Sequence, residues 1–179
     1  LVPEEARQPG AELTRLISFV DFAPTMLSLA GVVPPAWMQG RAFLGEHAAP
    51  APQYIFGFRG RMDERYDLSR SVRDDRYVYI RNFMPHRPWG QHVGYLFETP
   101  TTAVWKRMFD EGRLNATQRA FWEPKAYEEL YDLQNDRWEV KNLVDSAPHA
   151  VVLGRMREAL DTQARRIREL VRGAAGHDA

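Results

Sequence analysis

The apolar positions of this chain follow two periods, one typical of helices and one typical of strands. An apolar stripe with spacings of three and four predicts one long helix near the C-terminus, and its members are Leu153, Met156, Leu160, Ala164, Ile167 and Val171. Ser146 and Pro148 suit the start of this helix, and Gly173 suits its end. A shorter stripe over residues 101–111, followed by Gly112, predicts a second helix.

Short apolar and alternating stretches predict a small sheet. Residues 53–58 are apolar and aromatic, and residues 129–133 form another strand candidate. Residues 69–73 and 76–83 are predicted to form a hairpin that turns at residues 74–75. The side chains expected on one face of this hairpin are Val72, Tyr77, Tyr79 and Phe83.

The N-terminal part of the chain is less regular. Residues 1–12 are typical of a loop, and residues 13–20 of a buried strand or an extended lead-in. Asp21 and Pro24 predict the start of a short apolar helix that ends at Gly31. The proline-rich stretch after this helix is the best candidate for a domain boundary. Because long strand–helix alternation is missing, the predicted fold class is α+β, a small antiparallel sheet packed by a long C-terminal helix.

Composition narrows the classes of function. The chain has 179 residues and no cysteine, which excludes a disulfide framework, a cysteine zinc site and a thiol nucleophile within it. The 24 basic residues balance 24 acidic ones, so nucleic acid is not expected as a partner. No apolar run approaches the ~20 residues of a membrane span, and no membrane partner is expected. Without an initiator methionine or a visible signal, the chain is expected to be part of a longer protein whose compartment stays open.

Two segments are candidates for a binding site. Residues 59–65, reading RGRMDER, hold three arginines and two acids, and we expect them in a loop that emerges from the sheet. An arginine pair can hold sulfate, carboxylate or sugar hydroxyls, although a solvated, self-neutralising loop is the alternative. Residues 85–92 form a proline-braced loop with His92 and Trp89, and the alternative there is a structural loop anchored by the tryptophan.

No local pattern announces a nucleophile or a metal site. Ser146 and His149 lie three residues apart at a predicted helix start, which suits helix capping better than a catalytic pair. The acid pair at residues 74–75 suits a solvated turn, and no spacing typical of a metal-binding loop occurs.

Three motifs then occur in a fixed order. They are SFVDFAPTMLSLAG at residues 18–31, RSVRDDRYVYIRN at residues 70–82, and ELYDL at residues 129–133, followed by Asn142 and Leu143. Together they resemble the C-terminal part of a sulfatase of the alkaline phosphatase superfamily. The arginine-rich segment and the long insert after the hairpin resemble the sulfamidase-like (heparan N-sulfatase) branch. Val78 and Arg137 depart from the family pattern at positions that look structural.

The resemblance implies two parts and a division of labour. Residues 1–45 would be the C-terminal edge of an α/β catalytic domain, and residues 46–179 the sulfatase C-terminal subdomain. Such proteins hydrolyse sulfate esters or sulfamates with a formylglycine and a calcium ion. Since the motifs for both are missing here, the resemblance implies no catalytic or metal-binding residue in this chain and no activity of the chain alone.

The resemblance also implies a substrate pocket and partners. The residues expected to bind substrate are Arg59, Arg61, Asp63, Glu64 and His92. The expected partners are a sulfated small molecule or glycan and the protein's own N-terminal catalytic domain. The apolar segment 16–29 would lack a cover in the isolated chain, so self-association through it is expected.

Two other functions fit the same residues. The chain could be a non-enzymatic module for interaction or for binding sulfated glycans, or a relative of a phosphodiesterase of the same superfamily. The sequence upstream of Leu1 would discriminate between the module and the sulfatase.

Overall fold

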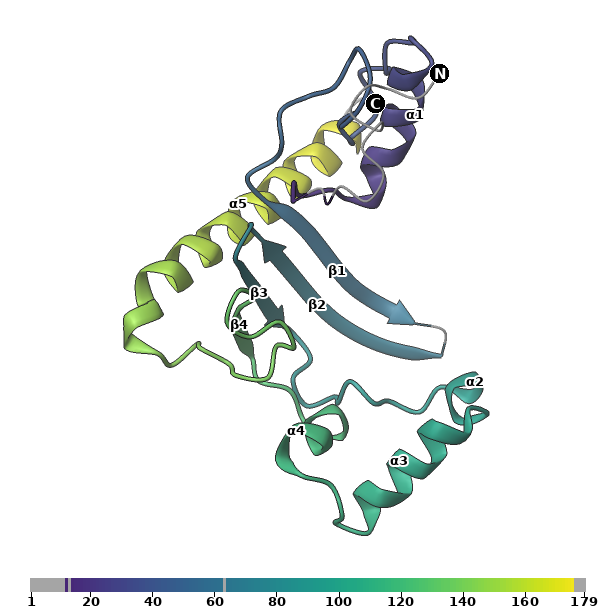
Figure 1. Ribbon diagram of the computed structural model, residues 1–179, viewed down its shortest axis with the longest axis vertical. Helices are drawn as coiled ribbons and strands as arrows, with labels where there is room; N and C mark the ends of the chain where they lie inside the picture. The colour runs from purple at the N-terminus through teal and green to yellow at the C-terminus, as the bar shows by residue number, and fades with distance from the viewer. Residues whose placement is uncertain (1–11, 13, 63, 176–179) are drawn as a thin grey trace. The chain divides into compact units, whose positions relative to one another are not determined.

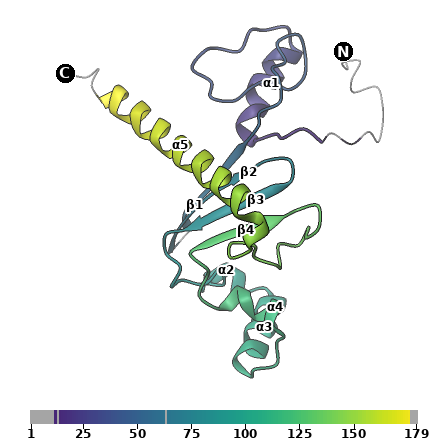
Figure 2. The same cartoon turned by 90° about the vertical axis from the view of Figure 1, so that its left-hand side faces the viewer.

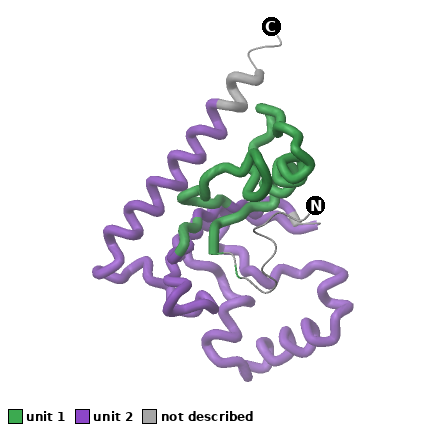
Figure 3. Tube along the Cα trace, turned by 45° about the horizontal axis from the view of Figure 1, so that its top comes forward, with its two compact units in different colours: residues 1–56, 73–75 green, residues 57–72, 76–179 purple. Residues whose placement is uncertain are grey.

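The computed structural model describes residues 12, 14–62 and 64–175. These residues divide into two compact units, coloured separately in Figure 3. The first unit holds the chain up to Phe56 together with residues 73–75, and the second holds residues 57–72 and the chain from Arg76 onward.

The first unit is built on η2 (Phe19–Asp21) and the helix α1 (Phe22–Leu29), which runs on directly from it. Gly31, with a φ of 72°, ends α1 as predicted. Of the two alternatives predicted for residues 13–20, the buried strand is wrong, because residues 14–18 are irregular and Phe19 is 90% exposed, whereas the lead-in fits the irregular chain before η2. Apolar character alone does not make a strand when no neighbouring strand offers backbone partners.

Polar side chains on one side of α1 hold the loop that follows it. Asp21, Thr25 and Ser28 are spaced four and three apart, so they share one face, and all three are buried. Their oxygens accept hydrogen bonds from three backbone N–H groups of the loop, namely Arg41 to Asp21 (2.8 Å), Phe43 to Thr25 (3.0 Å) and His47 to Ser28 (2.9 Å). This ladder closes an irregular segment that has no secondary structure of its own.

A four-stranded antiparallel sheet carries the rest of the chain (Figure 1). Its strands lie in sequence order and are β1 (Ile55–Met62), β2 (Arg65–Arg73), β3 (Tyr77–Asn82) and β4 (Glu128–Asp132). In the β3–β4 pair Tyr79 lies opposite Leu130, and both side chains are fully buried. The sheet and helices confirm the α+β prediction. The predicted face of the hairpin is also buried at Val72, Tyr77 and Tyr79, whereas Phe83 is 45% exposed.

The long helix α5 (Ala150–Ala175) follows the short turn η4 (Ala147–His149) and covers one face of the sheet (Figure 2). Leu153, Met156 and Leu160 are buried there, as the stripe predicts. Ala164 and Ile167 are exposed, and the side chain of Val171 lies outside the described residues. The helix passes through Gly173 to Ala175, so the predicted end there is wrong; a single glycine weakens a helix without stopping it.

Ion pairs join α5 to the edge of this core. Arg157 donates its Nε–H to Glu128 at 2.8 Å, and Arg81 donates an Nη1–H to Asp161 at 2.6 Å. Glu128 also accepts from the hydroxyl of Tyr79, and burial raises the pKa of Tyr79 to about 12.

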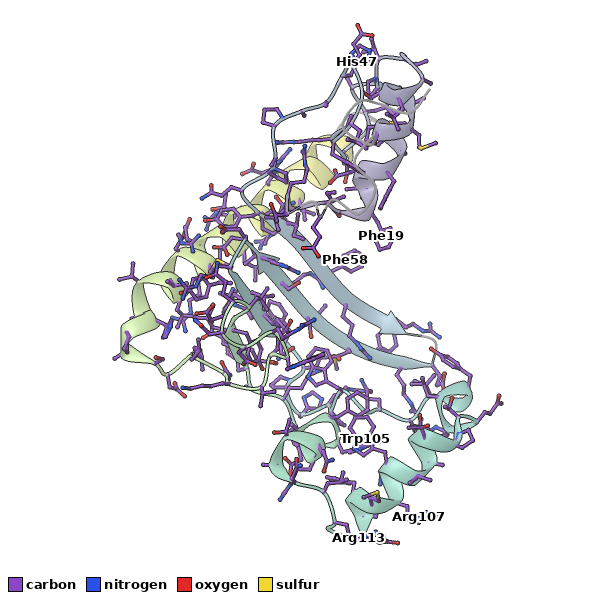
Figure 4. The ribbon with its side chains drawn as sticks, in the orientation of Figure 1. Phe19, His47, Phe58, Trp105, Arg107 and Arg113 are labelled. Carbon is purple, nitrogen blue, oxygen red and sulfur yellow. The ribbon has the colours of Figure 1, made fainter. Side chains whose placement is uncertain are left out.

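Between β3 and β4 the chain forms a helical lobe, residues 94–122. Its elements are α2 (Gly94–Phe97), α3 (Pro100–Asp110), α4 (Ala116–Arg119) and η3 (Ala120–Trp122). Trp105 stacks on Phe121 at 4.6 Å and meets the buried Trp122 edge-on (Figure 4). No helix in the described part of the chain has both the length and the apolar character needed to cross a membrane.

Candidate functional site

The arginine-rich segment lies mainly in strands and not in a loop, which corrects the prediction. Arg59 and Arg61 are in β1, two residues apart, and therefore on the same face of the strand. The connection to β2 is limited to residues 63–64, and Asp63 lies outside the described residues. The segment reads as a loop because charged residues are uncommon in strands, but their partners here come from neighbouring strands and a distant loop.

Arg59 has an anchored base and a partly exposed tip. Its Nε lies 3.2 Å from Oδ2 of Asp67, an ion-pair contact that is not aligned as a hydrogen bond. Its guanidinium carbon lies 5.4 Å from the centre of the Trp89 ring, a cation–π arrangement. The Arg59 side chain is 36% exposed. The structure thus brings together residues from the two segments that sequence analysis singled out separately.

Beneath Arg59 lies a buried ion pair that the sequence did not reveal. Lys125 donates to both carboxylate oxygens of Asp67 at 2.6 Å, and neither side chain is more than 1% exposed. The ammonium of Lys125 also lies 4.4 Å from the centre of the Trp89 ring. Its rarity, one of three lysines in the chain, is the only signal that could have drawn attention to it.

Arg61 and Glu64 lie near the tip of the β1–β2 hairpin and are exposed. The guanidinium of Arg61 lies 5.4 Å from the centre of the Tyr66 ring. A carboxylate oxygen of Glu64 accepts a hydrogen bond from the backbone N–H of Gly94 at 3.0 Å. Backbone hydrogen bonds, from its own N–H and from Gly94, lower the pKa of Glu64. Its carboxylate is therefore ionised at neutral pH.

His92 lies beside the same hairpin tip. Its backbone carbonyl accepts a hydrogen bond from Nε of Arg65, and its ring stacks on Phe97 at 4.4 Å. The backbone N–H that binds Glu64 belongs to Gly94, two residues after His92. Glu64 and His92 are therefore close to each other, whereas Arg59 lies further along β1, beside Trp89.

Ser146 and His149 contact each other through their side chains. Ser146 stands at the start of η4, but its hydroxyl lies 2.8 Å from Nδ1 of His149 and makes no side-chain cap, so the capping prediction is wrong in that detail. Within the described ranges, no three His, Asp or Glu side chains are grouped so as to hold a metal ion. The candidate site consists of the cations Arg59 and Arg61, the ionised carboxylate of Glu64 and the ring of His92.

Comparisons with known proteins agree on one kind of relative. No family model matches the chain. Two curated relatives from Formosa agariphila are ulvan-active sulfatases. One is 40% identical over 148 residues, covering 82% of this chain and 25% of the relative. The other is 32% identical over 146 residues, covering 78% of this chain and 27% of the relative. The chain therefore spans about a quarter of the length of the curated relatives it matches.

Solved structures show the same fold. A 2-O GAG sulfatase superposes with a TM-score of 0.58 at 19% identity, covering 91% of this chain and 28% of that one. A protein solved in complex with its substrate, D-glucosamine-2-N,6-O-disulfate, superposes with a TM-score of 0.51 at 16% identity, covering 83% of this chain and 24% of that one. These matches confirm the expected architecture and leave the sulfamidase-like branch a prediction.

Proposed function

We propose that this chain, which corresponds to a C-terminal part of the sulfatases it matches, supplies substrate-binding residues to a sulfatase acting on a sulfated polysaccharide such as ulvan. The observation that carries the proposal is that Arg59 is held on two sides and is still partly exposed. Its Nε lies 3.2 Å from Oδ2 of Asp67 and its guanidinium carbon lies 5.4 Å from the centre of the Trp89 ring, while its side chain is 36% exposed. Such a guanidinium suits the oxygens of a sulfate or a uronic carboxylate.

Calcium and formylglycine are implied for whole sulfatases by the family resemblance. The residues of this chain do not fit either group: it contains no cysteine, none of its serines begins a Ser-x-Pro-x-x-Arg motif, and its described residues offer no metal-binding cluster. We therefore assign this chain no step of hydrolysis. Its own contribution is to bind and orient the sugar, while the reacting groups would come from the remaining three quarters of a protein like its relatives.

The binding residues divide by charge. Arg59 and Arg61 would bind anionic groups of the substrate. Glu64 is ionised and would accept hydrogen bonds from sugar hydroxyls, and His92 would line the same edge of the pocket. For Asp63 the sequence predicts the same role as for Glu64, which is to accept hydrogen bonds from sugar hydroxyls or to orient the arginines.

The experiment is release of inorganic sulfate from ulvan. We expect the full-length protein to release sulfate and the 179-residue chain alone to release none. Arg59→Ala or Arg61→Ala in the full-length protein should raise KM by about tenfold, the worth of one charge-assisted hydrogen bond. The matched control is Arg107→Ala, an exposed arginine of α3 that only approaches Glu111, at 4.0 Å. Robust sulfate release by the chain alone, or unchanged kinetics in both arginine variants, would overturn the proposal.

A further inference from the structure

We propose that Lys125, Asp67 and Trp89 are positioning residues that hold Arg59 in place and keep its positive charge available for an anionic substrate group. The inference rests on the proposed function, since it concerns how Arg59 binds. Asp67 and Lys125 belong to no candidate segment of the sequence, and Trp89 is named there only in its loop, as the anchor in the structural alternative.

Lys125 balances the charge of Asp67 and so leaves the charge of Arg59 unbalanced. Asp67 is buried, and a buried carboxylate without a partner is costly. Lys125 satisfies both of its oxygens, and the backbone N–H of Leu68 adds a third hydrogen bond at 2.8 Å. Asp67 is therefore neutralised and hydrogen-bonded without Arg59. The cluster of two cations and one carboxylate carries a net charge of about +1, and that surplus lies on Arg59, its more exposed cation.

The ring of Trp89 lies beside both cations and restricts how Arg59 is oriented. Trp89 contacts both cations, at 4.4 Å from Lys125 and 5.4 Å from Arg59. The backbone beside this ring is held, because the N–H of Gly90 donates to the carbonyl oxygen of Phe121 at 2.7 Å. Contact with the ring of Trp89 restricts the guanidinium of Arg59, so less conformational entropy is lost when a ligand binds.

The two terminal nitrogens of Arg59 are available to bind a ligand. Among the residues that the structure describes, the two terminal nitrogens of Arg59 make no hydrogen bond, and its other contacts involve Nε and the ring face. These terminal N–H groups form the edge that binds two oxygens of a sulfate or carboxylate side by side. Without Lys125, Asp67 would be free to accept hydrogen bonds from the terminal N–H groups of Arg59 as well, which would remove that edge from the substrate.

The test is a double-mutant cycle in the full-length protein, with KM and kcat measured for sulfate release from ulvan. Lys125→Met and Arg59→Ala should each raise KM about tenfold with kcat changed by less than about twofold. The double variant should be no worse than Arg59→Ala, because Lys125 acts only through Arg59. The matched control is Lys106→Met, a lysine of α3 that pairs with Asp110 and should leave KM unchanged.

The outcomes separate this inference from the proposed function. If Arg59→Ala leaves KM unchanged, the positioning role is overturned because Arg59 has no substrate contact to position, and the proposed function fails with it only if Arg61→Ala also leaves KM unchanged. If Arg59→Ala raises KM while Lys125→Met does not, or if the two effects multiply in the double variant, only the positioning role is overturned.

A second variant covers the risk that Lys125→Met does not fold. Trp89→Leu keeps an apolar side chain at a half-buried position while removing the ring that contacts both cations. It should raise KM several-fold, with no further effect in the Arg59→Ala background. A KM equal to that of the unmodified protein, in a variant with an unchanged unfolding temperature, would overturn the positioning role.

Discussion

At the scale of single residues, carboxylates held by arginines contribute most clearly to the charge balance of the sheet. Arg76 donates to both oxygens of Asp132, at 3.0 and 2.7 Å, and Asn135 adds a further hydrogen bond at 2.8 Å. The hydrogen bonds from Arg76, and then those from Asn135 and Gln134, hold the pKa of Asp132 well below its usual range. Asp132 is the last residue of β4. Because its pKa is lower in the folded state, the ionised carboxylate stabilises the fold.

This gives a prediction for pH dependence. The pKa of Asp132 is lower in the folded state than in the unfolded state, where it is about 3.9. Its stabilisation is therefore fully present above that value and is lost as the pH falls through the folded-state pKa. Asp132→Asn should show a smaller loss of unfolding free energy between pH 7 and pH 3 than the unmodified chain, measured by urea unfolding.

The matched control is Asp110→Asn, because that exposed carboxylate of α3 pairs with Lys106 at the surface. It should keep the full loss of stability on acidification. An identical loss in the Asp132 variant would show that the hydrogen bonds of this carboxylate do not contribute to acid sensitivity.

At the scale of elements, local periodicity determined what the sequence could predict. The stripe at Leu153, Met156 and Leu160 predicts the buried face of α5 correctly, because helix burial repeats within a few residues. The strand character of residues 59–62 could not be predicted in the same way. Arg59 in this strand pairs with Asp67 of β2. Asp67 is in turn stabilised by Lys125, which lies 58 residues away along the chain, so no local sequence pattern reveals the arrangement.

The candidate site shows the same limit. The sequence identified Arg59 and its neighbours from local charge density, but it placed them in a loop. It missed the buried pair beneath Arg59, since burial of a lysine depends on tertiary contacts. An anchoring role for Trp89 is only the alternative that the sequence offers for residues 85–92, and the structure adds the two cations that contact the ring.

Two glycines, one in the loop held against α1 and one in α5, are expected to change the free energy of unfolding in opposite directions when replaced by alanine. A Cβ on Gly40 would lie 1.9 Å from the carbonyl oxygen of Val20, so Gly40→Ala must displace backbone. We expect it to lower the unfolding free energy by about 1–3 kcal/mol. Gly154→Ala in α5 meets nothing within 4 Å and should raise it by up to about 1 kcal/mol. Urea unfolding of both variants measures the pair, and a Gly40→Ala variant as stable as the parent would contradict the packing described.

At the scale of the whole molecule, the first unit presents an apolar surface on η2 and α1. Phe19 is 90% exposed and Met26 is 66% exposed, with Phe22 between them at 49% (Figure 4 labels Phe19). Self-association of the isolated chain through residues 16–29 stays a prediction, and this surface supports it, because contiguous exposed apolar side chains drive association.

The prediction is tested by sedimentation of the 179-residue chain over a range of concentrations. We expect association that weakens in the double variant Phe19→Ser, Met26→Gln. The control is Val151→Gln, which removes an equally exposed apolar side chain from α5. A chain that stays monomeric at high concentration and binds no apolar dye would contradict the prediction.

The most direct test of the central claim is a crystal structure of the full-length protein with a sulfated ulvan oligosaccharide bound. We expect the terminal nitrogens of Arg59 to lie about 2.7–3.2 Å from sulfate or carboxylate oxygens of the sugar. We also expect Asp67 to stay paired with Lys125 beside Trp89. A bound oligosaccharide that leaves Arg59 and the β1–β2 hairpin without any contact would contradict it.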